Sequence, residues 1–296
     1  MSRKIGCEEK DDEDIIESIH AGKQSETGSY SRREVCFVFS NMFRGKTALV
    51  TGGAGIIGAQ IVRMLYQNGA NVVFCDRNGE AGNLLLTSLN DSEDRLLFIP
   101  CDVCVSGEAR RVTDEALARF GRLDYLITVA GGSTREKGCY FYRQSEEVYT
   151  QNIQLNLFHA LYFAHAASGI MVKQRFGKMV FIASVLGTQG MRNNAEYSAA
   201  KAGLIAFAKT LAMEMGEFGI NINCVSPGLV PHPTGPVSAD ASDTNYLYRN
   251  CKPQEIAGAV KYLLSDDASF VTGVNLTVDG GWGLGVQAGL HSIDRK

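Results

Sequence analysis

The sequence predicts an α/β fold, with one doubly wound sheet of seven mostly parallel strands and helices on both faces. Short apolar, β-branched runs alternate with longer segments of helical periodicity, as parallel strands joined by crossover helices require. The chain has 296 residues, 45% of them hydrophobic, which is enough to fill one large core. Because no repeat or proline-rich linker interrupts the pattern, we expect a single domain over residues 41–296.

The expected strands are nearly continuous apolar runs, which is typical of strands buried on both faces. They lie at residues 46–51, 71–75, 95–100, 123–129, 178–184, 222–226 and 274–280. The segments between them repeat apolar residues every three to four positions, as helices do. These helices are expected at residues 59–67, 81–89, 108–120, 146–174, 195–217 and 253–264. Each strand is therefore joined to the next by a crossover helix.

The N-terminal part of the chain differs from this pattern. Its first 34 residues are polar and charged, and they become rich in serine and glycine towards their end. We therefore expect residues 1–40 to form a polar, mobile extension rather than part of the core. Within the domain, two unusually long polar loops are expected at 132–145 and 231–251, and loops of this length commonly cover binding sites.

Composition restricts the classes of function. A net charge of -3, a pI near 6.0 and scattered basic residues give no reason to expect a nucleic-acid partner. We also expect no membrane partner, because no unbroken apolar run approaches the roughly 18 residues of a spanning helix and no signal pattern opens the chain. The Cys101–Cys104 pair lacks a second CxxC or a nearby histidine, so no metal is expected. These features indicate a cytoplasmic protein with reduced thiols that acts on a small molecule.

A glycine-rich turn, "TGGAGIIG" at 51–58, follows the first strand and opens a helix. Its glycines allow positive φ and close approach of the backbone to a pyrophosphate, whose charge the helix N-terminus favours. Asp76 ends the second strand, where a carboxylate accepts hydrogen bonds from ribose hydroxyls and repels the 2′-phosphate of NADP. Arg77 offsets part of that repulsion, but the balance favours NAD(H). Asp102 follows the third strand, where it either binds the adenine edge or caps a helix.

A possible proton-transfer pair lies in "AEYSAAKAG", where Tyr197 and Lys201 are four residues apart on one helix face. A free tyrosine has a pKa of about 10 and is a poor base at neutral pH, whereas a lysine ammonium one turn away favours its phenolate. Ser184, at the end of the fifth strand, is suited to hydrogen-bond a substrate oxygen and hold it against Tyr197.

The same spacing occurs a second time, in "YRNCK" with Tyr248 and Lys252, so spacing alone is not informative. No strand-end serine precedes this second pair at a comparable distance. Pro253 follows it immediately and disfavours helical backbone at Lys252. We therefore interpret Tyr248 and Lys252 as part of the surface of the 231–251 loop.

Eight motifs together resemble the short-chain dehydrogenase/reductase family, single-domain type, across residues 46–282. They are "TGGAGIIG", "CDV" after the third strand, "AGG" after the fourth, "QLNLFHA", "IASVLG", "YSAAKAG", "NCVSPGLV" and "VTGVNLTVDGGW". The resemblance implies a Rossmann-type fold, a nicotinamide cofactor, and oxidation or reduction at an alcohol or carbonyl carbon. It also implies a homodimer or homotetramer that uses the long helices and the C-terminal strand.

The resemblance maps a catalytic set onto Asn156, Ser184, Tyr197 and Lys201. It implies that Tyr197 is the general acid/base, that Lys201 also holds the nicotinamide ribose, and that Asn156 positions a water linking Lys201 to solvent. The residues expected to contact the cofactor come from the strand ends and the catalytic helix. They are Gly52, Gly55, Ile57, Gly58, Asp76, Arg77, Asp102, Val103, Ala130, Gly131, Tyr197, Lys201, Pro227, Gly228 and Val230.

One departure from the family pattern concerns the branch. Ile56 stands where the single-domain branch has glycine, and with Gly55 the turn reads TGxxGxxG, the form of the extended branch that includes sugar epimerases. Only about 95 residues follow Lys201, which is few for the substrate domain of that branch. An epimerase or dehydratase that retains NAD therefore stays an alternative, as does a non-catalytic NAD-binding regulatory protein.

Two further departures affect the cofactor site. Thr128 and Val129 replace paired asparagines before "AG", which removes hydrogen bonds that brace the sheet in the family. The threonine that often follows "PG" is displaced by "PHPT", so His232 or Thr234 would approach the nicotinamide carboxamide differently, with Val230 as the backbone contact.

The substrate pocket is expected outside the strand carboxyl ends, between the loops 132–145, 186–196 and 231–251. Aromatic side chains in these loops suit an apolar ring or chain, namely Tyr140, Phe141, Tyr142, Tyr246 and Tyr248. Three arginines there either meet an anionic substrate or are ordinary exposed charges, namely Arg135, Arg143 and Arg192. A steroid, a sugar acid or polyol, and an acyl thioester all stay open as substrates.

Overall fold

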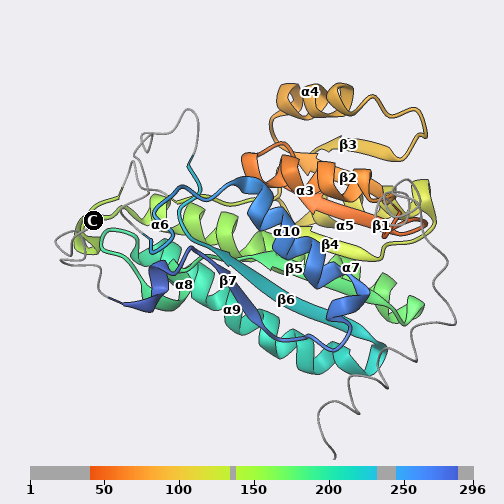
Figure 1. Cartoon of the computed structure of the whole chain (residues 1–296). Helices are drawn as coiled ribbons and strands as arrows, with labels where there is room; N and C mark the ends of the chain where they lie inside the picture. The colour runs from red at the N-terminus through yellow and green to blue at the C-terminus, as the bar shows by residue number, and fades with distance from the viewer. Residues whose placement is uncertain (1–40, 134–137, 232–244, 286–296) are drawn as a thin grey trace, which may run out of the picture. The chain divides into compact units, whose positions relative to one another are not determined.

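The computed structural model of the chain describes residues 41–133, 138–231 and 245–285 (Figure 1). The predicted N-terminal extension, Arg135, His232 and Thr234 lie outside these residues, so the expectations about them stay predictions. The predicted sheet is confirmed, and its strands are all parallel, in the order β3-β2-β1-β4-β5-β6-β7. The strands are β1 (Thr47–Thr51), β2 (Asn71–Asp76), β3 (Leu96–Pro100), β4 (Tyr125–Thr128), β5 (Gly177–Ile182), β6 (Ile220–Pro227) and β7 (Asn275–Val278).

The chain enters the sheet at β1, winds outward to β3, and then returns to β4 on the other side of β1. The direction of winding therefore reverses between β1 and β4, and such a reversal opens a crevice at the carboxyl ends of the strands. Thr51, the last residue of β1, pairs with Cys75 on β2 and with Thr128 on β4. This register brings the ends of the three strands together.

Helices cover both faces of the sheet, as predicted (Figure 1). On one face the core includes residues of α5, α7 and α9, and on the other it includes residues of α3, α4 and α10. The main helices are α3 (Ile56–Gln67), α4 (Gly79–Leu89), α5 (Ser106–Phe120), α6 (Glu146–Ile153), α7 (His159–Gln174), α8 (Leu186–Gln189), α9 (Ala195–Met215) and α10 (Pro253–Leu264). Shorter helical turns are η2 (Phe141–Arg143), η3 (Gln154–Phe158), η4 (Gly216–Phe218), η6 (Asp266–Ala268) and η7 (Trp282–Leu284).

The helix expected over 146–174 runs without a break through α6, η3 and α7. Within it, η3 is a π-helical turn. By length and composition alone this 29-residue stretch could cross a membrane. A core helix of a soluble protein meets the same test. In the structure, α7 buries residues such as Phe163 and Met171 in the core beside the sheet, as such a core helix does.

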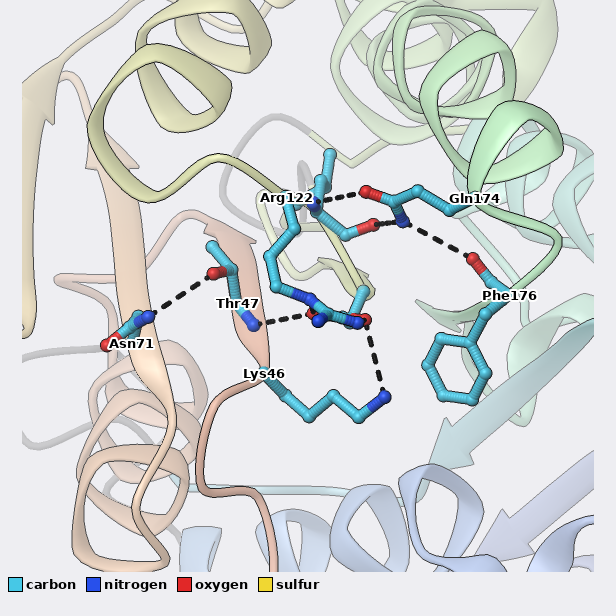
Figure 2. A network of polar contacts seen from close by, with 8 residues as sticks. Lys46, Thr47, Asn71, Arg122, Gln174 and Phe176 are labelled. Atoms are coloured by element: carbon cyan, nitrogen blue, oxygen red, sulfur yellow. Dashed lines mark hydrogen bonds and ion pairs between the residues drawn. The ribbon is translucent and has the colours of Figure 1, made fainter.

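A closed polar network lies at the amino ends of the central strands (Figure 2). Its centre is the fully buried carboxylate of Asp124, just before β4. This carboxylate accepts hydrogen bonds from the Thr47 backbone N–H at 2.9 Å and from two nitrogens of Arg122 at 2.7 Å each. Lys46 Nζ lies 3.6 Å from the same carboxylate. Because the charge is paired and its oxygens accept hydrogen bonds, burial of Asp124 is tolerated.

Candidate active site

The glycine-rich turn after β1 folds too tightly for side chains at several positions, Gly52 and Gly58 among them. Gly52 has a φ of +63°, and a Cβ atom there would lie 2.7 Å from the backbone of Ala130. A Cβ atom at Gly58 would lie 2.0 Å from the Gly52 carbonyl oxygen. The turn therefore requires glycine at both positions, and α3 begins immediately after Gly55 with its N-terminal N–H groups pointing out of the helix.

Asp76 fixes the shape of this turn. One of its carboxylate oxygens accepts a hydrogen bond from the Ala54 backbone N–H at 3.1 Å, and the other accepts one from Asn78 N–H at 3.0 Å. The carboxylate at the end of β2 is thus oriented by the backbone. Oxygens of a carboxylate can accept more than one hydrogen bond, so Asp76 retains acceptor capacity for a ligand.

A cavity of about 860 Å³ opens beside the glycine turn at the carboxyl ends of β1 to β4. Most residues predicted to contact the cofactor lie in its wall: Gly52, Gly55, Ile57, Gly58, Asp76, Arg77, Asp102, Val103, Ala130, Gly131 and Val230. Pro227, Gly228, Tyr197 and Lys201 are not part of this wall. Wall residues that the predicted set of cofactor contacts leaves out are Ile56, Cys101, Cys104, Val129, Thr150, Gln151, Gln154 and Leu155. For Cys101 the adjacent Asp102 was a usable signal, whereas no turn motif marks the helix residues 150–155.

Tyr197 and Lys201 both lie on α9, one turn apart, and Lys201 Nζ is 5.8 Å from the centre of the Tyr197 ring. Lys201 is buried, and its ammonium donates a hydrogen bond to the Ile182 carbonyl at 2.8 Å. Burial lowers the pKa of Lys201 to about 8. At neutral pH the group is still mainly protonated, so it places a positive charge beside the tyrosine ring.

Asn156 reaches the same place from η3. Its side chain is fully buried, donates to the carbonyls of Gly132 and Asn152 at 3.0 Å each, and accepts from Gly132 N–H at 3.0 Å. A Cβ atom added to Gly131 would lie 2.8 Å from Asn156 Oδ1 and 3.3 Å from Lys201 Nζ. Gly131 belongs to the cavity wall, so Asn156 and Lys201 both lie directly behind that wall.

Ser184 follows β5 and is only 8% exposed. Its hydroxyl oxygen accepts a hydrogen bond from Leu186 N–H at 3.2 Å, which leaves its own hydrogen to donate elsewhere. The short helix α8 that begins at Leu186 packs against α9, since a Cβ atom at Gly187 would lie 2.8 Å from the Lys201 carbonyl carbon. This packing holds the serine loop against the helix that carries Tyr197.

The second Tyr/Lys pair is arranged differently. Tyr248 has a φ of +50° and is 39% exposed, and Lys252 precedes the first residue of α10 with extended backbone. The two residues therefore do not share a helix face as Tyr197 and Lys201 do.

The family departures have visible consequences at β4. The buried Thr128 hydroxyl has no hydrogen-bond partner among the described residues. The Val129 N–H bonds to the carbonyl and to the hydroxyl of Thr51, at 3.2 and 3.1 Å. The link between β1 and β4 therefore comes from Thr51 rather than from side chains on β4. Ile56, the departure that concerns the branch of the family, begins α3 and lines the cavity.

The loop expected beside the substrate carries a stack of exposed rings. The Tyr140 and Tyr142 rings stack with centroids 6.0 Å apart, and the Arg192 guanidinium lies 4.8 Å from the Tyr140 centroid. Ser133 donates a hydrogen bond of 2.6 Å to Asn194, just before α9. These contacts join the described parts of the 132–145 loop to the segment that leads into α9.

A parallel sheet with a strand–glycine turn–helix unit, and a tyrosine and a lysine one helical turn apart on α9, is typical of nucleotide-dependent oxidoreductases. Comparison with known proteins makes the assignment specific. Residues 52–283 match the family described as enoyl-(acyl carrier protein) reductase. The chain belongs to the short-chain dehydrogenase/reductase family.

Several characterised relatives span most of the chain. The 3-oxoacyl-(acyl-carrier-protein) reductase FabG of Chlamydia trachomatis is 34% identical over 257 residues, covering 82% of this chain and 99% of the relative. Tropinone reductase-like 2 of Erythroxylum coca is 33% identical over 265 residues, covering 85% and 95%. The Escherichia coli FabG is 34% identical over 244 residues, covering 81% and 98%.

Proposed function

We propose that the protein is an NAD(H)-dependent dehydrogenase/reductase that interconverts a secondary alcohol and a ketone. The observation that supports this proposal most strongly is that Asn156 and Lys201 both lie behind Gly131, with Tyr197 one helical turn from Lys201. Relatives named as a 3-oxoacyl-(acyl-carrier-protein) reductase and as tropinone reductase-like 2 support the carbonyl chemistry. The names differ in substrate, so they support the reaction type rather than a particular compound.

The cavity fits a dinucleotide because its wall is bare of side chains where a pyrophosphate would approach, at Gly52 and Gly58. Residues Gly52 to Gly58 and the N-terminus of α3 would hold the phosphates, and Asp76 would hold the adenosine ribose. A bound nicotinamide supplies the hydride donor or acceptor of the reaction. We favour NAD over NADP because the oriented Asp76 carboxylate would repel a 2′-phosphate, with Arg77 beside it as the feature that favours NADP.

The side chains of the protein then transfer the proton and position the substrate oxygen. Tyr197 takes the proton from the alcohol oxygen during oxidation and returns it during reduction. The Lys201 ammonium favours the phenolate form of Tyr197, and the Ile182 carbonyl holds that ammonium in place. The Ser184 hydroxyl donates to the substrate oxygen and keeps it near Tyr197. Asn156 fixes the chain at Gly132, and with it the wall between the cavity and Lys201.

The experiment that tests this proposal is a panel of hydroxysteroids, polyols and β-hydroxyacyl compounds, each assayed with NAD and with NADP by absorbance of the reduced nicotinamide. We expect turnover with at least one class, and a higher kcat/KM with NAD. Stoichiometric NAD in the purified protein, with no release of NADH for any alcohol, would instead support a retained-cofactor epimerase or dehydratase. Cofactor binding without any turnover would support a regulatory NAD-binding protein.

We also propose a homodimer or homotetramer. Large apolar side chains are exposed on the outer helices and near β7, with Phe158 41%, Met213 83% and Phe270 103% exposed. Burial of such side chains between subunits is favourable. Light scattering at micromolar concentration is expected to give two or four times 32.1 kDa, and a monomer mass would refute the proposal.

A further inference from the structure

His159 is a buried histidine that no step of the proposed reaction uses. It is the first residue of α7, three residues after Asn156, and is 1% exposed. Histidine is rarely enclosed so completely without a specific partner. Its surroundings therefore need a physical explanation.

The imidazole makes one contact that fixes its tautomer. Its Nδ1 lies within hydrogen-bond distance of the Leu155 carbonyl oxygen. A carbonyl oxygen can only accept, so Nδ1 carries the proton and Nε2 presents a lone pair. Nε2 has no hydrogen-bond partner within the part of the chain that the structure describes.

The contact compensates for a change in the helix backbone. In an α-helix the His159 N–H would bond to the Leu155 carbonyl, four residues back. Here η3 shifts it to the Gln154 carbonyl, five residues back, as in a π-helix. The Leu155 carbonyl thereby loses its α-helical partner and accepts the His159 ring N–H. The side chain thus stabilises the irregular turn that contains Asn156.

Charge around the ring keeps it neutral. Burial, and secondarily the positive charge of Lys201 on α9, lower the pKa of His159 to about 3. On β6, burial raises the pKa of the Cys224 thiol to about 12, so this other titratable group near Lys201 is also uncharged at neutral pH. A neutral ring keeps its Nε2 lone pair, and its Nδ1–H continues to donate to the Leu155 carbonyl oxygen.

We propose that His159 is a positioning residue: by holding the Leu155 carbonyl it fixes the π-helical turn that places Asn156 against Gly132 and beside Lys201. It touches neither substrate nor cofactor in this role and acts through Asn156. Its effect on turnover rests on the proposed dehydrogenase function, whereas its effect on the turn does not.

The first test compares His159→Leu, which keeps an apolar body but has no donor, with His159→Asn, whose amide can donate from nearly the same position as Nδ1. We expect His159→Leu to lower kcat by about ten- to a hundredfold through misplacement of the site. The dissociation constant for NAD should stay near the wild-type value, and His159→Asn should recover most of kcat. Unchanged kcat in His159→Leu, or equal losses in both variants, would overturn the proposal.

Two further measurements need no substrate. Amide hydrogen exchange of Gly132 and of residues 152–160 should be faster in His159→Leu and close to wild type in His159→Asn. In wild-type protein, the ring nitrogen chemical shifts of His159 should report a neutral Nδ1–H tautomer from about pH 5 to 8. An Nε2–H tautomer or an imidazolium would overturn the proposal even if His159→Leu does not fold. If no alcohol is oxidised by wild type, the proposed function fails, and these two readouts still decide the role of His159.

Discussion

The buried polar groups at the two ends of the parallel strands differ in how many hydrogen-bond partners the chain gives them. At the amino ends, Asp124 is enclosed by partners from the chain itself, and every partner approaches within hydrogen-bond or ion-pair distance (Figure 2). At the carboxyl ends, Thr128 and His159 keep polar atoms without a partner among the described residues, and Asp76 faces a cavity. A network closed on itself contributes to stability, whereas a network left open retains donors and acceptors for a ligand.

Burial of a charge therefore does not by itself identify a catalytic or binding site. Lys201 and Asp124 are both buried charges. Lys201 donates to the Ile182 carbonyl and lies near a tyrosine ring, whereas the Asp124 carboxylate is surrounded by the Thr47 N–H, the Arg122 guanidinium and the Lys46 ammonium. The pKa of Lys201 is lowered accordingly. Variants at each end of the strands should therefore separate catalysis from stability.

The largest effect is expected at Lys201. In Lys201→Met the tyrosine loses its neighbouring positive charge, so kcat should fall by about 10² to 10⁴. The folded-state pKa of about 8 lies below the unfolded value of 10.5, so burial of the ammonium costs stability below pH 8, and this cost disappears as the pH rises towards 10.5. The variant should therefore unfold at higher urea concentration at pH 7, by about 3 kcal/mol in free energy.

Measurement of kcat and of urea unfolding at pH 7 and pH 10.5 checks both parts of this prediction. The gain in stability should shrink at the higher pH. A variant that is less stable at pH 7 than wild type, or one with unchanged kcat, contradicts the assignment of Lys201 as a buried catalytic ammonium.

At the amino ends, Asp124→Asn should have the opposite effects to Lys201→Met: it should lower stability and leave kcat unchanged. Removal of the buried charge leaves Arg122 without its ion pair, and we expect a loss of about 2 to 3 kcal/mol in the free energy of unfolding. The matched control is Asp94→Asn, whose partner Arg119 lies in an exposed ion pair that should contribute about 0 to 1 kcal/mol. Folded Asp124→Asn protein should keep wild-type kcat; a large loss of kcat would mean that the two ends are coupled.

Asp76→Asn tests which cofactor the open end accepts. The amide oxygen can still accept from Ala54 N–H, while the negative charge that repels a 2′-phosphate is gone. We expect the ratio of kcat/KM for NAD to that for NADP to fall by about ten- to a hundredfold, the size of one hydrogen bond to a charged group. The assay uses the best alcohol of the panel with both cofactors. An unchanged ratio would show that Asp76 does not select the cofactor.

The smallest effect is expected at Thr128. Its buried hydroxyl has no partner among the described residues, so Thr128→Val should raise the free energy of unfolding by about 1 kcal/mol. The control is Thr113→Val. The equally buried Thr113 hydroxyl donates to carbonyls of α5 at 2.8 and 2.9 Å, so this variant should be less stable than wild type. Urea unfolding of both variants checks the difference. Destabilisation by Thr128→Val would show that this hydroxyl is satisfied after all.

The layered fold and the shared helix face of Tyr197 and Lys201 could be predicted from local sequence. Apolar runs give strands, helical periodicity gives crossovers, and strand ends such as Ser184 and Asp76 carry polar groups. The predicted helix over 195–217 placed Tyr197 and Lys201 on one face, and the structure has them there. Such features depend on neighbours within a few residues, which is the range over which propensity and pattern act.

The rest depends on contacts between distant parts of the chain. The Asp124 network joins Lys46, Thr47, Asn71, residues 122–124, Gln174 and Phe176, which no local pattern connects (Figure 2). The π-helical turn at η3 was also not predicted, because its backbone shift follows from packing and from the His159 ring rather than from periodicity. Four residues of this helix line the cavity for the same reason, because the sheet sets the orientation of the helix; they are Thr150, Gln151, Gln154 and Leu155.

The central claim is that Tyr197 transfers the proton at the substrate oxygen, and Tyr197→Phe tests it most directly. The measurement is kcat with NAD and the best alcohol of the panel, alongside the dissociation constant for NAD, with Tyr262→Phe as control because Tyr262 is 44% exposed on α10. The account predicts that Tyr197→Phe lowers kcat by about 10² to 10⁴, binds NAD as wild type does, and differs from Tyr262→Phe, which stays active. Wild-type turnover by Tyr197→Phe would contradict the account.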